Sequence, residues 1–358
     1  MATTEEEIQK ILNHPEQIIS KYNLVYLDED KLLIKRKKYG RGFTYINQGR
    51  RIKNKSERQR IKDLAIPPMW QKVRISPIAN GHLQAVGFDA ETRKQYLYHP
   101  QWTILRNATK FYKMYPFGKK LPLIREQVDK DLNKKGWPEE KVVALVIRLM
   151  EETHIRIGNT QYEKKNESYG LTTLRKRHID IFQNSVKIEF TGKSGKKFHI
   201  NIEDERLIEL INQCEEIPGW TLFKFYDEEG TKRSLKSNHV NDYLQSLCGS
   251  LFTAKDFRTW SASVTFCNYL LDLDPTDDPD RKKKNLLQAY DAAAEALGNT
   301  RAVCRQYYVH PKIIDVYLND TFYEHFDHND KADDKAYLSP TEEKLIELYK
   351  DYEPKLDE

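Results

Sequence analysis

The chain has 358 residues, of which 32% are charged and 39% are apolar, which is typical of a globular protein with two or three domains. Its longest strongly apolar run, residues 142–147, is too short to cross a bilayer, and acidic residues 1–7 lack the apolar segment of a secretory signal. The four cysteines form no Cys-x-x-Cys pair, which favours reduced thiols. We therefore expect a cytoplasmic protein with no membrane partner.

The net charge of +5 is unevenly distributed along the chain. Residues 324–358 hold 12 acidic and 5 basic side chains, a formal charge of −7, so the first 323 residues carry +12. Basic clusters occur at residues 35–38, 50–60, 175–177, 193–197 and 281–284. Basic clusters interleaved with Tyr and Trp indicate a polyanion-binding surface, although a solvated face is the ordinary alternative for any one cluster.

Residues 1–110 predict a small strand-rich domain with a basic face. Helices are expected at residues 5–22 and at 57–64, the second one capped by Ser56. Strands are expected at residues 24–27, 31–36, 43–46, 70–75 and 81–88, followed by a basic and aromatic stretch at residues 93–99.

Residues 116–122 have the Pro and Gly content of a linker or turn, and helices dominate beyond them. Helices are predicted at residues 123–132, 138–153, 203–213, 238–247, 254–271 and 282–297. Strands at 185–191 and 197–202 predict a hairpin with a basic tip. Ser339 caps a last helix reaching Tyr352. We expect an α+β fold: a β-rich domain (1–110), a mainly helical domain with a small hairpin sheet (111–323) and an acidic tail with a terminal helix (324–358).

Two cofactor-binding motifs are excluded. Gly192-Lys193-Ser194 is not a phosphate-binding loop, because Lys187 stands where that loop needs glycine and a strand is predicted after the serine. His154, His178 and His199 are scattered singly, as structural or solvated histidines usually are. We therefore expect neither a metal site nor a cofactor.

Two adjacent tyrosines, Tyr307 and Tyr308, follow a Gly-Asn pair typical of a helix end. A tyrosine hydroxyl, with a pKa of about 10, is a poor nucleophile at neutral pH unless cations surround it. Three cations stand in distinctive positions: Arg156 after a long helix, Lys193 at the hairpin tip and Arg258 between aromatic residues. Each also has an ordinary structural interpretation, as a helix-terminal arginine, a solvated turn lysine and a stacked arginine.

Together the motifs resemble one family, the type IB DNA topoisomerases, in the short form shared by poxviruses and many bacteria. The resemblance runs from about Phe43 to Leu318 and rests on the order of many motifs, any one of which would be weak alone. The motifs are Ile66-Pro-Pro-Met-Trp70, Gly81-His-Leu-Gln-Ala85, Arg93-Lys-Gln-Tyr-Leu-Tyr98, Ile155-Arg-Ile-Gly-Asn159, Tyr162-x-Lys-x-Asn-Glu-x-x-Gly170, Phe190-Thr-Gly-Lys193, Lys255-Asp-Phe-Arg-Thr259 and Gly298-Asn-Thr…Tyr308.

The resemblance implies the roles of five residues. It places the catalytic arginines at Arg156 and Arg258, the catalytic lysine at Lys193 and the nucleophile at Tyr308, nine residues after Asn299. Poxvirus members and the related tyrosine recombinases carry histidine where this chain has Asn299. An amide can donate a hydrogen bond to a phosphate oxygen but cannot shuttle a proton, so this position needs only to donate.

The implied activity is relaxation of supercoiled DNA. One strand would be cut through a 3′-phosphotyrosyl intermediate and religated without ATP or metal. The implied partner is double-stranded DNA, bound by a nucleoid-associated monomer whose N-terminal domain clamps the duplex. The DNA contacts implied are Gln95, Tyr96, Tyr98, Tyr162 and Lys255.

Two alternatives stay open. A tyrosine recombinase or integrase shares the arginines, lysine and tyrosine, although recombinases usually carry a helical N-terminal domain and act as tetramers at defined sites. A catalytically inactive DNA-binding protein is the other alternative, against which the complete set of cations argues.

Overall fold

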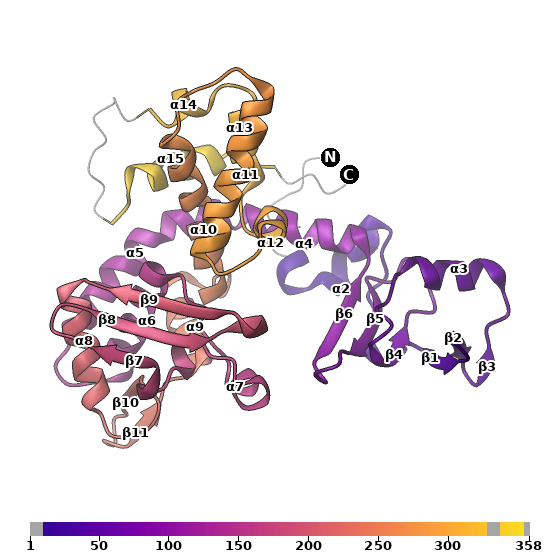
Figure 1. Cartoon of the computed structure of the whole chain (residues 1–358), viewed down its shortest axis with the longest axis horizontal. Helices are drawn as coiled ribbons and strands as arrows, with labels where there is room; N and C mark the ends of the chain where they lie inside the picture. Colours follow the sequence, from indigo (N-terminus) through magenta and orange to yellow (C-terminus); the bar gives the residue numbers. More distant parts are fainter. Residues whose placement is uncertain (1–9, 328–336, 354–358) are drawn as a thin grey trace. The chain divides into compact units, whose positions relative to one another are not determined.

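The computed structural model describes residues 10–327 and 337–353 (Figure 1). The chain forms two compact units, the first containing the chain up to Tyr112 and the second spanning Lys113–Tyr352. Each is described by itself below. The α+β fold predicted from the sequence is confirmed, with a β-rich first unit and a mainly helical second unit.

The first unit is built on one antiparallel sheet with the strand order β3-β2-β1-β4-β5-β6. Its strands are β1 (Ile34–Tyr39), β2 (Gly42–Asn47), β3 (Arg50–Arg51), β4 (Gln71–Ile75), β5 (Leu83–Phe88) and β6 (Lys94–Tyr98). Its helices are α2 (Pro15–Ile18), α3 (Lys55–Asp63) and α4 (Pro100–Tyr112). Ile34, Val73, Ile75 and Ala85 of the sheet pack on Ile61 of α3 and form a small apolar core.

Two predictions for the first unit differ from the structure. Residues 24–27, predicted as a strand, form only an isolated bridge between Val25 and Gly81. Helix α3 is capped by Asn54 rather than by Ser56, because Asn54 Oδ1 accepts from the backbone N–H of Glu57 at 3.1 Å. Of the helix predicted at residues 5–22, residues 5–9 lie outside the described residues, and its end is α2 followed by the 3₁₀ turn Ile19–Tyr22.

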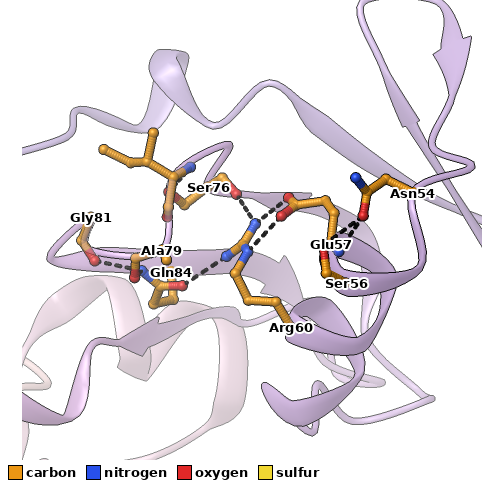
Figure 2. A network of polar contacts seen from close by, with 9 residues as sticks. Asn54, Ser56, Glu57, Arg60, Ser76, Ala79, Gly81 and Gln84 are labelled. Atoms are coloured by element: carbon orange, nitrogen blue, oxygen red, sulfur yellow. Dashed lines mark hydrogen bonds and ion pairs between the residues drawn. The ribbon is translucent and has the colours of Figure 1, made fainter.

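Arg60 joins α3 to the sheet (Figure 2). Its guanidinium donates to Glu57 Oε1 at 2.6 Å, to the carbonyl of Ser76 at 2.8 Å and to Gln84 Oε1 at 3.2 Å. The amide nitrogen of Gln84 in turn donates to the carbonyl of Gly81 at 2.6 Å. The helix and the β4–β5 connection are thereby held by one shared cation, with every polar group of the network paired as burial requires.

The second unit packs its helices around α6, the helix whose residues 142–147 are all buried. Its helices are α5 (Met114–Leu132), α6 (Glu139–Thr153), α7 (Thr160–Asn166), α8 (Glu205–Glu216), α9 (Ser237–Cys248), α10 (Ala254–Leu271), α11 (Pro279–Ala296), α12 (Arg301–Tyr307), α13 (Pro311–Leu318), α14 (Phe322–His325) and α15 (Pro340–Tyr349). A three-stranded antiparallel sheet has the order β7 (Ile179–Ile181), β8 (Val186–Thr191), β9 (Lys197–Ile202), and β10 (Lys224–Tyr226) pairs with β11 (Lys232–Ser234). Residues 142–147 are apolar on all sides of the helix, and such a segment must be buried on all sides.

Residues 116–122, predicted as a linker or turn, lie inside α5. Pro116 falls in the first turn of α5, where a missing N–H leaves no helical hydrogen bond unmade. Gly118 is needed for packing, since a Cβ there would lie 2.4 Å from the Trp260 ring and 2.7 Å from Ile346. The glycine therefore permits a close approach of α10 and α15 to α5 and marks no turn.

Helix α15 is part of the second unit's core, whereas the prediction set residues 324–358 apart as a tail. Leu345 and Tyr349 of α15 are buried. Arg125 of α5 is held between Glu342 of α15 and Glu151 of α6, both at 2.8 Å. The predicted cap is present, since Ser339 Oγ accepts from the backbone N–H of Glu342 at 3.3 Å. One of the twelve acidic residues of this segment, Glu342, is thus a buried partner of Arg125.

Candidate active site

Arg156 emerges where α6 ends. His154 caps α6 in the left-handed conformation, with φ of +53°, and its N–H donates to the carbonyl of Met150 at 3.1 Å. The backbone beyond it is fixed by the N–H of Leu171, which donates to the Arg156 carbonyl at 2.9 Å. From this fixed backbone the half-buried guanidinium of Arg156 donates through Nη2 to Asn299 Oδ1 at 2.5 Å.

Arg258, which is 5% exposed, lies on the first half of α10. Its Nη1 donates to the carbonyl of His154, the C-cap of α6, and its Nη2 donates to the carbonyl of Leu297, the C-cap of α11, at 2.7 Å. Helix C-termini carry partial negative charge, which suits a cation. Arg258 thereby joins the C-terminal ends of α6 and α11. Arg156 and Asn299 each lie two residues beyond one of these C-caps.

Two donors in this cluster are buried and unpaired. Among the described residues, neither Nε of Arg258 nor Nδ2 of Asn299 has a hydrogen-bond partner. Because an arginine can only donate, the oxygen of the Asn299 amide must face Arg156, and the amide nitrogen faces elsewhere. Buried donors without partners cost stability and are rare, so their presence in this cluster indicates a place where a ligand's acceptor atoms belong.

Tyr308 brings a hydroxyl to the same place. The short helix α12 starts at its cap Thr300 and ends at Tyr308, whose N–H donates to the carbonyl of Cys304 at 3.0 Å. The guanidinium carbon of Arg258 lies 5.7 Å from the centre of the Tyr308 ring. The ring of Tyr308 therefore lies at Arg258, and its neighbour Tyr307 is the last residue of α12.

The electrostatics of the cluster favour an anion. Burial first, and then the like charge of Arg156, lower the pKa of Arg258, and Tyr308 opposes both, so that the pKa is about 10. Burial likewise lowers the pKa of Arg156. Both arginines are still cationic at neutral pH, and two buried like charges are stabilised by an anion placed between them.

Lys193 is on the turn between β8 and β9, which Gly192 closes by donating its N–H to the carbonyl of Lys196 at 2.7 Å. The side chain is exposed, and within the described part of the chain its ammonium makes no hydrogen bond or ion pair. The structure therefore brings Arg156, Arg258, Asn299 and Tyr308 together and leaves Lys193 in solvent at the tip of the hairpin.

The residues expected to contact DNA are all on the surface of their units. Tyr96 and Tyr98, 42% and 41% exposed, stand on one face of β6 with parallel rings 6.0 Å apart. Gln95, the residue before Tyr96, donates to Asp89 Oδ2 at 2.9 Å. Tyr162 on α7 is 59% exposed, and Lys255 is exposed in the first turn of α10.

Sequence reasoning missed the carbonyls of His154 and Leu297, which hold Arg258. A backbone carbonyl has no residue-type signature, so only the predicted helix ends at these places could have pointed to them. In the parts of the chain that the structure covers, no three His, Cys, Asp or Glu side chains gather closely enough to hold a metal ion. Nor does any described helix have the length and apolarity to span a membrane.

Comparisons with known proteins agree with this geometry. Residues 97–328 match the family model for the catalytic core of eukaryotic DNA topoisomerase I, and residues 42–89 match that for the N-terminal domain of bacterial DNA topoisomerase IB. DNA topoisomerase 1B of Acanthamoeba polyphaga mimivirus is 32% identical over 83% of this chain and 92% of its own length. DNA topoisomerase 1B of Vaccinia virus is 24% identical over 66% of this chain and 73% of its own, and DNA topoisomerase 1 of Drosophila melanogaster is 26% identical over 43% and 15%. The chain belongs to the type IB DNA topoisomerases, as its motifs predict.

Proposed function

We propose that this protein relaxes supercoiled duplex DNA by cutting and resealing one strand, with Tyr308 as the nucleophile. The observation that carries the proposal is the convergence of Arg156, Arg258, Asn299 and Tyr308, with two buried donors that lack partners. The hydroxyl of Tyr308 attacks the phosphorus and gives up its proton. The bond from phosphorus to the 5′ oxygen breaks, and the strand stays attached through a 3′-phosphotyrosyl link.

The transition state of this step carries negative charge on the two non-bridging phosphate oxygens. Arg156 and Arg258 are planar donors that match such oxygens, and Nδ2 of Asn299 is a further donor. All three are held in place before DNA binds, so they need little rearrangement when charge develops. A preorganised donor of this kind typically contributes about 2.7–4 kcal/mol to lowering the barrier.

Lys193 is the proposed general acid for the leaving 5′ oxygen. Its ammonium has three rotatable donors on a flexible stem, and its exposed place at the hairpin tip lets it approach bound DNA. A positioned general acid contributes typically about 10²–10⁴-fold to the rate. In resealing, the same amine takes the proton back as the 5′ hydroxyl attacks the phosphotyrosyl bond.

ATP and metal independence belong to the proposal. Exchanging one phosphodiester for another keeps the bond energy for religation, and two arginines supply positive charge at the phosphate. All four clustered residues come from one chain, which supports action as a monomer. We propose double-stranded DNA as the partner in a nucleoid-associated cytoplasmic enzyme, with the exposed Tyr96 and Tyr98 of the N-terminal unit clamping the duplex.

A tyrosine recombinase would use a similar residue set. The relatives named above are topoisomerases, and the N-terminal unit of this chain is built on a six-stranded sheet rather than on helices. Both observations favour relaxation. Relaxation of a plasmid that lacks any special site, by dilute protein in EDTA, separates the two activities, because a recombinase acts as a tetramer on defined sites.

The deciding experiment compares Tyr308→Phe with Tyr307→Phe. We expect Tyr308→Phe to abolish plasmid relaxation and the covalent DNA adduct on denaturing gels, because the attacking oxygen is gone. Binding of duplex DNA should stay near that of the wild type. Tyr307→Phe is the matched control and should keep both activities. Loss of the adduct in Tyr307→Phe alone would contradict the assignment, and a wild type without any adduct would contradict the function.

A further inference from the structure

The aromatic ring of Phe198 on β9 lies between two glycines, each of which directly precedes a proposed catalytic residue. Gly192 precedes Lys193, and a Cβ at Gly192 would lie 2.6 Å from Cε2 of the ring. Gly298 precedes Asn299, and a Cβ at Gly298 would lie 2.4 Å from Cζ. Carbon atoms that are not bonded do not approach so closely, so the ring touches both backbones where any side chain would displace it.

One of these two contacts is with a fixed part of the protein. Gly298 adopts φ of +59° directly after Leu297, which is fully buried and accepts a hydrogen bond from Arg258. The backbone N–H of Asn299 donates to the carbonyl of Ala294 at 2.8 Å. The turn that carries Asn299 is therefore anchored to α11 and to Arg258, and it offers the ring an immobile surface.

The other contact is with the hairpin that carries Lys193. Phe198 pairs with Phe190 across β8 and β9, and their rings are parallel with centres 5.0 Å apart. Residues 193–197 beyond the ring are all exposed. At the base of this exposed turn, the hairpin contacts the rest of the unit through the ring of Phe198 on one strand. On the opposite strand it does so through the carbonyl of Thr191, which accepts from Tyr169 N–H at 2.9 Å.

From this placement we propose that Phe198 is a positioning residue that sets the Lys193 hairpin at a fixed distance from the Asn299 turn. The inference rests on the proposed role of Lys193 as general acid. The ring has one face stacked on Phe190 and its far edge against Gly298, so it fixes where the base of the turn stands. With the backbone fixed, the Lys193 ammonium then reaches the leaving oxygen only by rotations within its own four-carbon side chain.

The test separates positioning from packing by changing the leaving group. Single-turnover cleavage is measured on a duplex with a normal scissile phosphate and on one with sulfur in place of the bridging 5′ oxygen. A thiolate leaves without a proton, because thiol pKa values are near 8.5, so the sulfur duplex does not need the general acid. A displacement of about 1 Å costs about 100-fold in rate, which is the loss we expect for Phe198→Ala on the normal duplex.

On the sulfur duplex, Phe198→Ala should cleave at nearly the wild-type rate. This result also reports the folded fraction, since the same preparation must be folded to cleave at all. Ile200→Ala is the matched control, because Ile200 lies on the same strand and the same face, two residues further from the tip. It should cleave both duplexes as the wild type does. Phe198→Leu, which keeps apolar bulk against Gly298, should recover part of the loss.

A double variant tests whether the ring acts through the lysine. If it does, adding Phe198→Ala to Lys193→Ala produces no further loss on the normal duplex, whereas independent effects would multiply. The inference is overturned if Phe198→Ala cleaves the normal duplex at the wild-type rate, if its defect persists on the sulfur duplex, or if the two losses multiply. A wild type that forms no adduct on either duplex would instead refute the proposed function.

Discussion

Asn299 uses the two ends of its amide differently. Its Oδ1 accepts from Arg156 at 2.5 Å, while its Nδ2 is buried without a partner among the described residues. The first contact fixes the side chain, and in the proposed function the second atom donates to the phosphate. On this proposal the position needs a donor and no proton transfer, and an amide meets that need.

We expect Asn299→Ala to slow single-turnover cleavage by about 100- to 1000-fold, since one preorganised donor is lost. Asn299→His should keep most of the rate, because a ring N–H can donate in the same place. Asn299→Asp keeps an acceptor for Arg156 but has no donor and adds a negative charge, so it should be slower than Asn299→Ala. An Asn299→Asp variant as fast as wild type would refute the donor role.

At this scale the sequence predicted side chains but not the backbone that aims them. The residue types and motifs pointed to Arg156, Arg258, Asn299 and Tyr308, which the structure brings together. Nothing in the residue types pointed to the carbonyls of His154 and Leu297, because every residue has one and only the fold decides which carbonyl faces a guanidinium.

Among the elements, α15 shows how a charged helix becomes part of a core. Arg125, Glu151 and Glu342 have side chains that are 18%, 15% and 8% exposed, and Trp260 donates its indole N–H to Glu342 Oε1 at 2.9 Å. Burial alone would raise the pKa of Glu342, but the hydrogen bonds and charge of Arg125 lower it below its ordinary value. The helix is held by a desolvated ion network in addition to its apolar face.

Arg125→Met should therefore be severely destabilising. It leaves two buried carboxylates without their cation, which typically costs about 3–5 kcal/mol in the free energy of unfolding. Urea denaturation followed by tryptophan fluorescence measures the loss. Lys130→Met on the same helix is the control, because the pair of Lys130 and Glu126 is 62% and 48% exposed and such pairs contribute about 1 kcal/mol or less. Equal losses in the two variants would contradict the network's role.

Strongly periodic elements were predictable and the closely packed helix start was not. The helix expected at 254–271 is α10, and the strand expected at 197–202 is β9. Residues 116–122 were misjudged because Pro and Gly act locally as turn signals, whereas the reason for Gly118 is the ring of Trp260, far along the chain. The composition of residues 116–122 cannot indicate a packing partner that is so distant in the sequence.

For the molecule as a whole, charge predicts how it binds. The first 323 residues carry +12, and the basic clusters recur through both units. We expect the affinity of Tyr308→Phe for duplex DNA to fall by about 10³-fold or more between about 50 mM and about 200 mM NaCl, as for proteins that make six or more phosphate contacts. Fluorescence anisotropy at several salt concentrations measures the slope. Lys255→Ala should reduce that slope by about one, and an affinity that does not change with salt would contradict phosphate binding.

The division of the chain into domains was the hardest feature to predict from the sequence. The acidic composition of residues 324–358 predicts a tail with a terminal helix, and in the structure Leu345 and Tyr349 of that helix are buried in the second unit. The net charge of a segment is a sum over all its side chains. Whether its helix packs on the core depends instead on a few apolar residues along one face of that helix.

The packing of α15 on His310 also has a mechanical consequence. His310 follows the proposed nucleophile by two residues and is fully buried, with its ring stacked on Tyr349 at 3.9 Å and against Tyr352 at 4.5 Å. In the proposed covalent intermediate, a pull of the DNA strand on Tyr308 would pass along the backbone to this stack. On the proposed mechanism, the anchoring of His310 by α15 would hold Tyr308 in place against the torque of the DNA until religation.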